Sequence, residues 1–174
     1  MEDGHNLLQK AYEAILNSDY EQAEAWFEQA IAEEPDNADY HYRLSITFAR
    51  SNKLNKAVLH AAKAVELDAS REDYRLHLET LQSRELLYEA ERTLDGTEAK
   101  AYLAVELLKR AVALDPLNTE AYLLLSVAAD AAGEYALALQ SVQEALRLDP
   151  AHEAARTLLP KAQRKLSQYL GTES

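Results

Sequence analysis

The sequence predicts an all-α solenoid of about four helix pairs followed by a C-terminal capping helix. The chain repeats itself with a period of 34 residues, so that Ala23 recurs as Ala57. Further along, Ala104 recurs as Ala138 at the same spacing. A fixed period of this length is typical of solenoids, in which each unit buries its apolar face only by stacking on its neighbours. Good helix formers fill the chain, which has only four Gly and four Pro, and no alternating run of Val, Ile and Thr predicts a strand.

The first two predicted units are similar in length. The first covers about residues 3–37, and apolar residues at helical spacing between Leu7 and Leu16 predict its first helix. Pro35 ends its second helix. The second unit covers about residues 38–71 and repeats this order, with a polar turn between its two helices.

The third predicted unit, residues 72–117, carries an insertion of 13 residues, because Ala104 follows Ala57 by 47 residues and not by 34. The extra residues surround Asp95-Gly96, a dipeptide that favours a tight turn. The helical pattern continues on both sides, so we expect an arm near residues 85–98 made of two lengthened helices. Such an arm projects on the order of 10 Å, given a rise of about 1.5 Å per residue. Thr97 is the expected N-cap of the return helix.

The fourth predicted unit, residues 118–152, has the cleanest pattern. After it, residues 153–170 read as one amphipathic helix, which suits the polar-faced terminal helix that a solenoid needs. Pro160 lies inside this helix and predicts a kink or a break near Leu159, because proline removes one backbone hydrogen bond. Residues 171–174 read as a frayed tail.

The composition excludes several classes of protein. The formal net charge of −12 makes the chain acidic and disfavours binding to nucleic acid. Without cysteine, the chain has neither a disulfide framework nor a thiolate metal site. The start of the chain does not read as a secretory signal, and no long apolar stretch predicts insertion into a membrane. We therefore expect a cytoplasmic protein.

Charge is distributed unevenly along the chain. Residues 1–42 carry eleven acids and one base, whereas residues 43–65 carry five bases and no acid. A run of this kind is usually a solvated helix face. The alternative is a local basic strip that attracts an acidic segment of a partner.

The fourth unit carries a characteristic order of aromatic, small and apolar residues: Tyr122, Leu125, Ser126, Ala129, Gly133, Tyr135, Ala138, Val142, Ala145 and Pro150. This order resembles the tetratricopeptide repeat pattern. Small residues at Ser126 and Ala138 let two helices cross closely, and Pro150 ends the second helix. The third unit departs from the pattern, because Glu79 stands where a small residue belongs.

The resemblance implies a single tetratricopeptide repeat domain over residues 1–174, with antiparallel helix pairs stacked in a right-handed superhelix. It also implies that the first helix of each pair lines a concave groove that receives an extended peptide or a partner helix. Projecting the inward positions of the family onto this sequence gives the groove set Leu8, Tyr12, Tyr42, Arg43, Ile46, Arg50, Leu76, His77, Arg84, Leu123, Leu124 and Val127.

One subfamily of these repeats binds the C-terminal carboxylates of heat-shock chaperones through Lys, Asn and Arg. The corresponding positions here hold Leu8, Tyr12, Arg43, Asp73 and His77, and none of them matches. The sequence therefore does not predict that ligand, although Arg43 places a donor suited to a carboxylate in the groove.

No catalytic motif is present, so we expect neither an enzyme nor a cofactor. There is no Gly-rich phosphate loop, and no two of the five histidines stand at the helical spacing that would make them paired metal ligands. His77 is the histidine projected into the groove, where a polar lining role is expected rather than catalysis.

The sequence predicts an adaptor or scaffold that binds a protein or peptide segment in the groove. The groove mixes apolar residues with Arg43, Arg50 and Arg84, so the ligand should carry apolar anchors and at least one acidic group. Two alternatives remain open. One is a dedicated chaperone for one client protein, and the other is a homo-oligomeric assembly protein that dimerises through the arm at residues 85–98.

Overall fold

The computed structural model describes residues 4–172, apart from the side chains of His5 and Thr172. All regular structure in this range is α-helical, which confirms the predicted all-α class. Among these residues, no helix combines the length and the apolar character that crossing a membrane requires. The expected start of the first unit at residue 3, and the expected frayed tail at residues 173–174, lie outside the described residues.

Contacts along the chain divide it into two compact units. Unit 1 is residues 1–81 and unit 2 is residues 82–174. The boundary falls inside one helix, α5 (Glu72–Thr93), whose first ten residues belong to unit 1.

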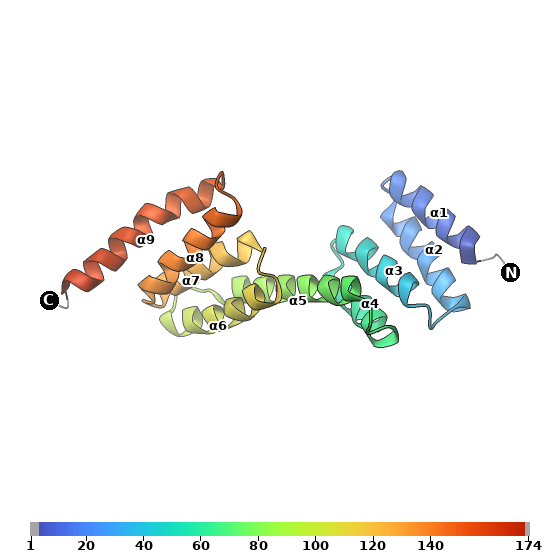
Figure 1. The fold of residues 1–174 in the computed structure, drawn as a ribbon, viewed down its shortest axis with the longest axis horizontal. Helices are drawn as coiled ribbons and strands as arrows, with labels where there is room; N and C mark the ends of the chain where they lie inside the picture. The colour runs from blue at the N-terminus through green and yellow to red at the C-terminus, as the bar shows by residue number, and fades with distance from the viewer. Residues whose placement is uncertain (1–3, 173–174) are drawn as a thin grey trace. The chain divides into compact units, whose positions relative to one another are not determined.

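Unit 1 consists of two helical hairpins and the first part of α5 (Figure 1). Its buried core includes Phe27, Leu44, Phe48 and Leu81, which are at most 1% exposed. The two hairpins are built from α1 (Gly4–Leu16), α2 (Tyr20–Glu33), α3 (Ala38–Arg50) and α4 (Leu54–Leu67).

Polar residues begin the helices of unit 1 as their positions in the turns require. The Asp19 side chain accepts a hydrogen bond from the backbone N–H of Gln22 at 3.0 Å, and Asn37 caps α3 in the same way. The tight turns place Ser18 and Asn52 at φ 60°, in the left-handed region. Their position in the 34-residue period is the same, so both turns demand the same unusual backbone.

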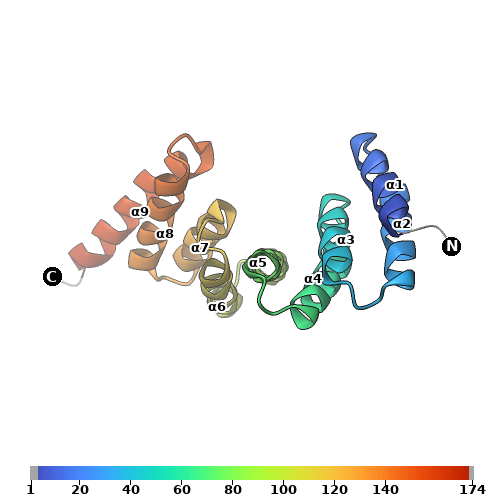
Figure 2. The same ribbon diagram turned by 45° about the vertical axis from the view of Figure 1, so that its right-hand side comes forward.

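Unit 2 combines the second part of α5 with the remaining helices. Figure 2 shows α7 and α8 as a hairpin with α9 lying along α8. One core cluster fills the space between α5, α6 and α7, and a second one joins α8 to α9. These helices are α6 (Glu98–Leu114), α7 (Thr119–Ala131), α8 (Tyr135–Leu148) and α9 (Glu153–Thr172).

In both units, the same kind of serine-to-carbonyl hydrogen bond links two paired helices where they cross. Ser45 Oγ donates to the carbonyl oxygen of Ala57 at 2.8 Å, and Ser126 Oγ donates to that of Ala138 at the same distance. All four residues are at most 3% exposed. A small side chain on each helix permits the close approach, and the hydroxyl finds its partner in the facing backbone.

The α5–α6 hairpin has longer helices than the hairpins of unit 1. α5 has 22 residues and α6 has 17, whereas α3 and α4 have 13 and 14. Leu86 and Ala90 of α5 pack in one cluster with Ala101 and Leu108 of α6. The small residue of α5 at this packing is therefore Ala90, while Glu79 forms an ion pair with Arg75 at 2.9 Å.

The turn between α5 and α6 places Thr97 where the sequence predicts it. Thr97 is the N-cap residue of α6, but its side chain makes no capping hydrogen bond. Instead, Thr97 donates both its N–H and its hydroxyl to Asp95, which also pairs with Lys100 at 2.7 Å. Gly96 has φ 89°, which explains the glycine at this position.

The C-terminal helix α9 is also more regular than the sequence predicts. It runs without interruption from Glu153 to Thr172 and contains Pro160. Of the two outcomes expected near Leu159, a kink or a break, the break is absent, and Gly171 and Thr172 are helical rather than part of a frayed tail. Leu158 and Leu159 pack against the cluster that joins α8 to α9, and this tertiary packing favours continued helix on both sides of the proline.

Candidate partner-binding surface

Eight members of the predicted groove set belong to unit 1, where α1, α3 and the first part of α5 carry them. Six of these form the surface that we call the α1–α3–α5 surface: Tyr12, Tyr42, Arg43, Arg50, Leu76 and His77. The other two, Leu8 and Ile46, are half-buried, and Leu8 packs against the core. Leu8 therefore offers a partner less of its side chain than its projected position suggested.

Arg43 links α1 to α3 on this surface. Its guanidinium carbon lies 5.4 Å from the centre of the Tyr12 ring, and its Nε donates to Asp39 Oδ2 one turn earlier on α3. Tyr12 in turn packs edge-on against Phe27, with ring centres 6.1 Å apart. Among the described residues only the Nε of Arg43 is engaged in a hydrogen bond, so both Nη groups remain for a ligand carboxylate.

Asp39 sits in a partly dry environment beside this arginine. Burial raises the pKa of the Asp39 carboxyl, and the neighbouring Arg71 guanidinium opposes that effect. Arg71 is held in a bidentate contact with Asp73 at 2.9 and 2.7 Å and lies 4.5 Å from the Tyr74 ring centre. The contact with Arg71 lowers the pKa of Asp73. Sequence reasoning missed Asp39 and Arg71 because neither stands at an inward position of the repeat.

An aromatic cluster joins α3 to α5. The Tyr42 ring lies 4.6 Å from the Tyr74 ring and 5.3 Å from the imidazole of His77, the latter edge-on. Tyr74 is 2% exposed and forms the floor of the cluster, whereas Tyr42 is half-buried. Burial raises the pKa of the Tyr42 hydroxyl, so this side chain is neutral at physiological pH and available for apolar contact.

His77 has a structural role in this cluster. Its Nε2 lies 2.9 Å from Ser45 Oγ, whose hydrogen is already used towards Ala57. The serine oxygen therefore accepts from the Nε2–H of His77. Burial lowers the pKa of His77, which favours the neutral imidazole. The histidine thus orders the surface rather than serving as a base.

Leu76 and Arg50 form the exposed rim of the α1–α3–α5 surface. Leu76 is 50% exposed although it is a large apolar residue. Arg50 is exposed at the end of α3 and has no ion pair among the described residues. An apolar contact and a cation are therefore available together on unit 1.

The remaining members of the predicted set lie in unit 2, and they are not equivalent. Leu123 is only 6% exposed and belongs to the core, while Leu124 is packed against the α5–α6–α7 cluster. Arg84 is half-buried on α5. Val127 is 43% exposed and lines a cavity of about 270 Å³ beside the ion pair of Asp130 with Lys165. Only Val127 among the three apolar residues presents a sizeable side-chain surface.

The basic strip at residues 43–65 is largely neutralised by the fold. Lys53 Nζ lies 2.6 Å from the buried carboxylate of Glu24, and Lys63 pairs with Glu66 at 3.0 Å. Arg43 pairs with Asp39, as described above. Lys56 lies over the Phe48 ring, and Arg50 has no ion pair among the described residues, so Arg50 and the two Nη groups of Arg43 remain for a partner. Sequence order did not predict this, because Glu24 comes from the preceding hairpin.

His41 and His60 form a pair that joins α3 to α4. His41 Nε2 lies 3.1 Å from the carbonyl oxygen of Pro35, so Nε2 is the protonated nitrogen and donates. His41 Nδ1 then accepts from the Nδ1–H of His60, 3.0 Å away. Burial, His41 and the Lys56 ammonium all lower the pKa of His60. A search for helical spacing missed this pair, because its members lie on different helices.

The described residues do not provide a metal site. No group of three or more His, Asp or Glu side chains among them is arranged to hold an ion. The residues brought together on unit 1 instead offer aromatic, apolar and cationic side chains, and aromatic residues and arginine are enriched at protein–protein interfaces.

Comparisons with known proteins agree with this fold. A tetratricopeptide repeat family model matches residues 8–72 and 101–153, which together are more than half of the chain. A search of the curated proteins finds no match. Solved structures with the same fold include a crystal structure of MamA protein, which is 18% identical with a TM-score of 0.55, over 98% of this chain and 91% of that chain.

Two further solved structures show the same likeness. The MamA 41-end structure from Desulfovibrio magneticus RS-1 is 16% identical with a TM-score of 0.58, over 99% of this chain and 96% of that chain. A tetratricopeptide repeat protein from Parabacteroides merdae ATCC 43184 is 19% identical with a TM-score of 0.56, over 95% of this chain and 61% of that chain. At these identities the likeness concerns the fold, an all-α solenoid.

Proposed function

This chain belongs to the tetratricopeptide repeat family, and we propose that it is a protein–protein interaction scaffold whose partner docks on the α1–α3–α5 surface of unit 1. The partner is an extended peptide or a helix with apolar anchors and at least one acidic group. The family match supports the general role, and the geometry of unit 1 supports this ligand.

The observation that carries the proposal is the pairing of aromatic and cationic contacts across neighbouring helices. Arg43 is held in place by Asp39 and the Tyr12 ring, yet both of its Nη groups are available. Such a preorganised guanidinium binds a carboxylate without first losing side-chain freedom. The half-buried Tyr42 and the exposed Leu76 supply apolar contacts.

The direct test replaces the two arginines. Arg43→Glu combined with Arg50→Glu should weaken binding of the natural partner by about 2 kcal/mol or more, roughly thirtyfold, because a cation is replaced by a repelling anion. The partner is first identified by affinity purification and mass spectrometry from the native cell, and the affinity is then measured by calorimetry.

The matched control is Arg156→Glu combined with Arg164→Glu, which makes the same change in net charge on exposed positions of α9. It should leave the affinity within about twofold of the parent, apart from a small long-range effect that salt removes. Equal losses in both double variants, or no loss in either, would exclude the α1–α3–α5 surface as the docking site.

A second candidate function is homo-oligomeric assembly through the α5–α6 hairpin. Leu86 is buried and Leu87 is packed, but Tyr88, Tyr102 and Leu103 are 41%, 45% and 55% exposed. Exposed apolar residues on one hairpin favour self-association. Tyr102→Lys combined with Leu103→Glu should then lower the mass measured by sedimentation equilibrium. An unchanged mass would leave the hairpin without this role.

A further inference from the structure

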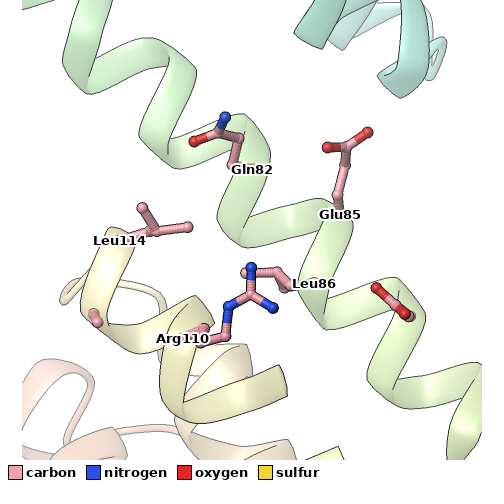
Figure 3. Close-up of a pocket in the computed structure, with 7 residues that line it drawn as sticks. Gln82, Glu85, Leu86, Arg110 and Leu114 are labelled. Atoms are coloured by element: carbon pink, nitrogen blue, oxygen red, sulfur yellow. The ribbon is translucent and has the colours of Figure 1, made fainter. Parts of the chain in front are cut away.

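A groove of about 690 Å³ lies in unit 2 between the second part of α5 and the end of α6. None of its residues belongs to the predicted groove set. Figure 3 shows the Arg110 guanidinium beside Leu86, with the Glu85 carboxylate turned away from it. The lining residues are Gln82, Glu85, Leu86, Glu89, Arg110, Ala113 and Leu114.

Two like charges face this groove without compensation. Glu85 and Glu89 stand one turn apart on α5, at the i, i+4 spacing at which two carboxylates repel each other. Neither of them forms an ion pair with another described residue, and Arg110 pairs with neither. Arg110 thus contributes a guanidinium to the groove without neutralising the glutamates.

The environment of Glu85 differs from that of an ordinary surface glutamate. Glu91 on the same helix, by contrast, is exposed to water. Glu85 is half-buried, and this burial raises the pKa of its carboxyl. An unpaired, partly dry carboxylate is an unfavourable arrangement that a cation from outside would relieve.

We propose that this groove binds a segment of a partner protein that inserts a Lys or Arg side chain between Glu85 and Glu89. Apolar neighbours of that side chain pack on Leu86 and Leu114, and the Arg110 guanidinium donates to backbone carbonyl oxygens of the segment. The overall charge of −12 also favours the approach of a basic segment. The site is separate from the α1–α3–α5 surface and selects the opposite charge.

The probe is a library of short random peptides, displayed and selected against the parent protein. Binders are then screened against Glu85→Lys combined with Glu89→Lys. The matched control is Glu91→Lys combined with Glu98→Lys, which makes the same change in charge at exposed positions of the same hairpin that do not line the groove. Circular dichroism verifies that each variant is folded, and Glu85→Gln with Glu89→Gln replaces the reversal if it is not.

The proposal predicts a class of peptides that carry Lys or Arg beside apolar residues and lose at least tenfold in affinity on the groove variant. The same peptides should keep their affinity for the control and should shift the methyl resonances of Leu86 and Leu114. Peptides that lose affinity on the groove variant but lack a basic residue would overturn the proposal. So would basic peptides that bind the groove variant and the control equally, or a selection that yields no peptide sensitive to the groove variant.

Discussion

Unit 1 and unit 2 are built from helix pairs of the same kind, but the polar residues that they bury differ. Among the described residues, unit 1 buries Glu24 and His41, whereas the buried polar residues of unit 2 are serines. Glu24 accepts hydrogen bonds from Ser51 and Lys53, both at 2.6 Å, and so ties α2 to the following hairpin. In unit 2 the corresponding contacts between helices are made mainly by Ala, Leu and Val.

The two units therefore share the geometry of their helix pairs but differ in the contacts between neighbouring helices, which include polar residues in unit 1 and are mainly apolar in unit 2. Apolar packing is insensitive to pH, whereas burial lowers the pKa values of His60 and His77 and so disfavours their charged forms. Unit 1 therefore combines the proposed docking surface with contacts between helices whose stability depends on pH. The single tryptophan, Trp26, lies on α2, so its fluorescence reports on unit 1 alone.

The largest expected effect comes from overpacking the close helix crossing that both units share. Ala57→Leu in unit 1 and Ala138→Leu in unit 2 should each lower the free energy of unfolding by roughly 1–3 kcal/mol, because both sites are fully packed. Urea titrations followed by circular dichroism for both variants, and by Trp26 fluorescence for the first, measure the two costs. A tolerated leucine in only one unit would show that the two crossings are not equivalent.

The next largest effect distinguishes Ser45 of unit 1 from Ser126 of unit 2. Ser45→Ala removes the bond to the Ala57 carbonyl and also leaves the Nε2–H of His77 without its partner, so it should cost about 2 kcal/mol. Ser126→Ala removes one bond and should cost about 1 kcal/mol. The same titrations provide both values. Equal costs would mean that the contact with His77 adds nothing to the stability of unit 1.

The pH dependence of stability should also differ between the units. The pKa values of His60 and His77 are lowered below 6.5 in the folded state, so unfolded chains bind more protons near that pH. The stability that these residues contribute is therefore present above pH 6.5 and is lost as the pH falls below it. Unit 2 contains one histidine, His152, which lies 3.2 Å from Glu120 near the surface.

Thermal melts at about pH 7.5 and about pH 5.5 measure this effect. The midpoint followed by Trp26 fluorescence should fall at the lower pH, and His60→Phe should reduce the fall. A midpoint that is independent of pH would contradict the assignment of His60 and His77 as half-buried, neutral residues.

The smallest effect concerns the turns. Ser18 in unit 1 and Gly133 in unit 2 both have positive φ, of 60° and 75°. Ser18→Gly should stabilise unit 1 by roughly 0.5–1 kcal/mol, because glycine adopts this backbone without strain, and Gly133→Ser should destabilise unit 2 by a similar amount. Changes of the same sign in the two variants would show that the turns differ in more than backbone angle.

The fold could be predicted from the sequence because the signals for it are local. Apolar spacing within each helix and the 34-residue period define the helix pairs without knowledge of distant contacts. Contacts such as that between Ser45 and His77, 32 residues apart, required the helices to be in place first. For the same reason Leu123 was projected as a groove residue although the structure buries it.

The repeat pattern predicted neither which residues of α5 pack against α6 nor which charged residues form ion pairs. Carrying the period into the longer third unit placed Glu79 at the helix crossing, whereas Ala90 packs there. The basic strip looked continuous because Glu24, which pairs with Lys53, lies 29 residues earlier in the chain. Composition along the chain therefore predicts charge, but only the fold determines which charges remain for a partner.

The most direct test of partner docking on unit 1 is backbone hydrogen exchange measured with and without the natural partner. Docking on the α1–α3–α5 surface predicts slower exchange in α3 and in residues 72–81 of α5. Exchange in α7 and α8 should be unchanged, because α7 and α8 lie outside both proposed surfaces. Protection confined to α7 and α8, with α3 unchanged, would contradict docking on this surface.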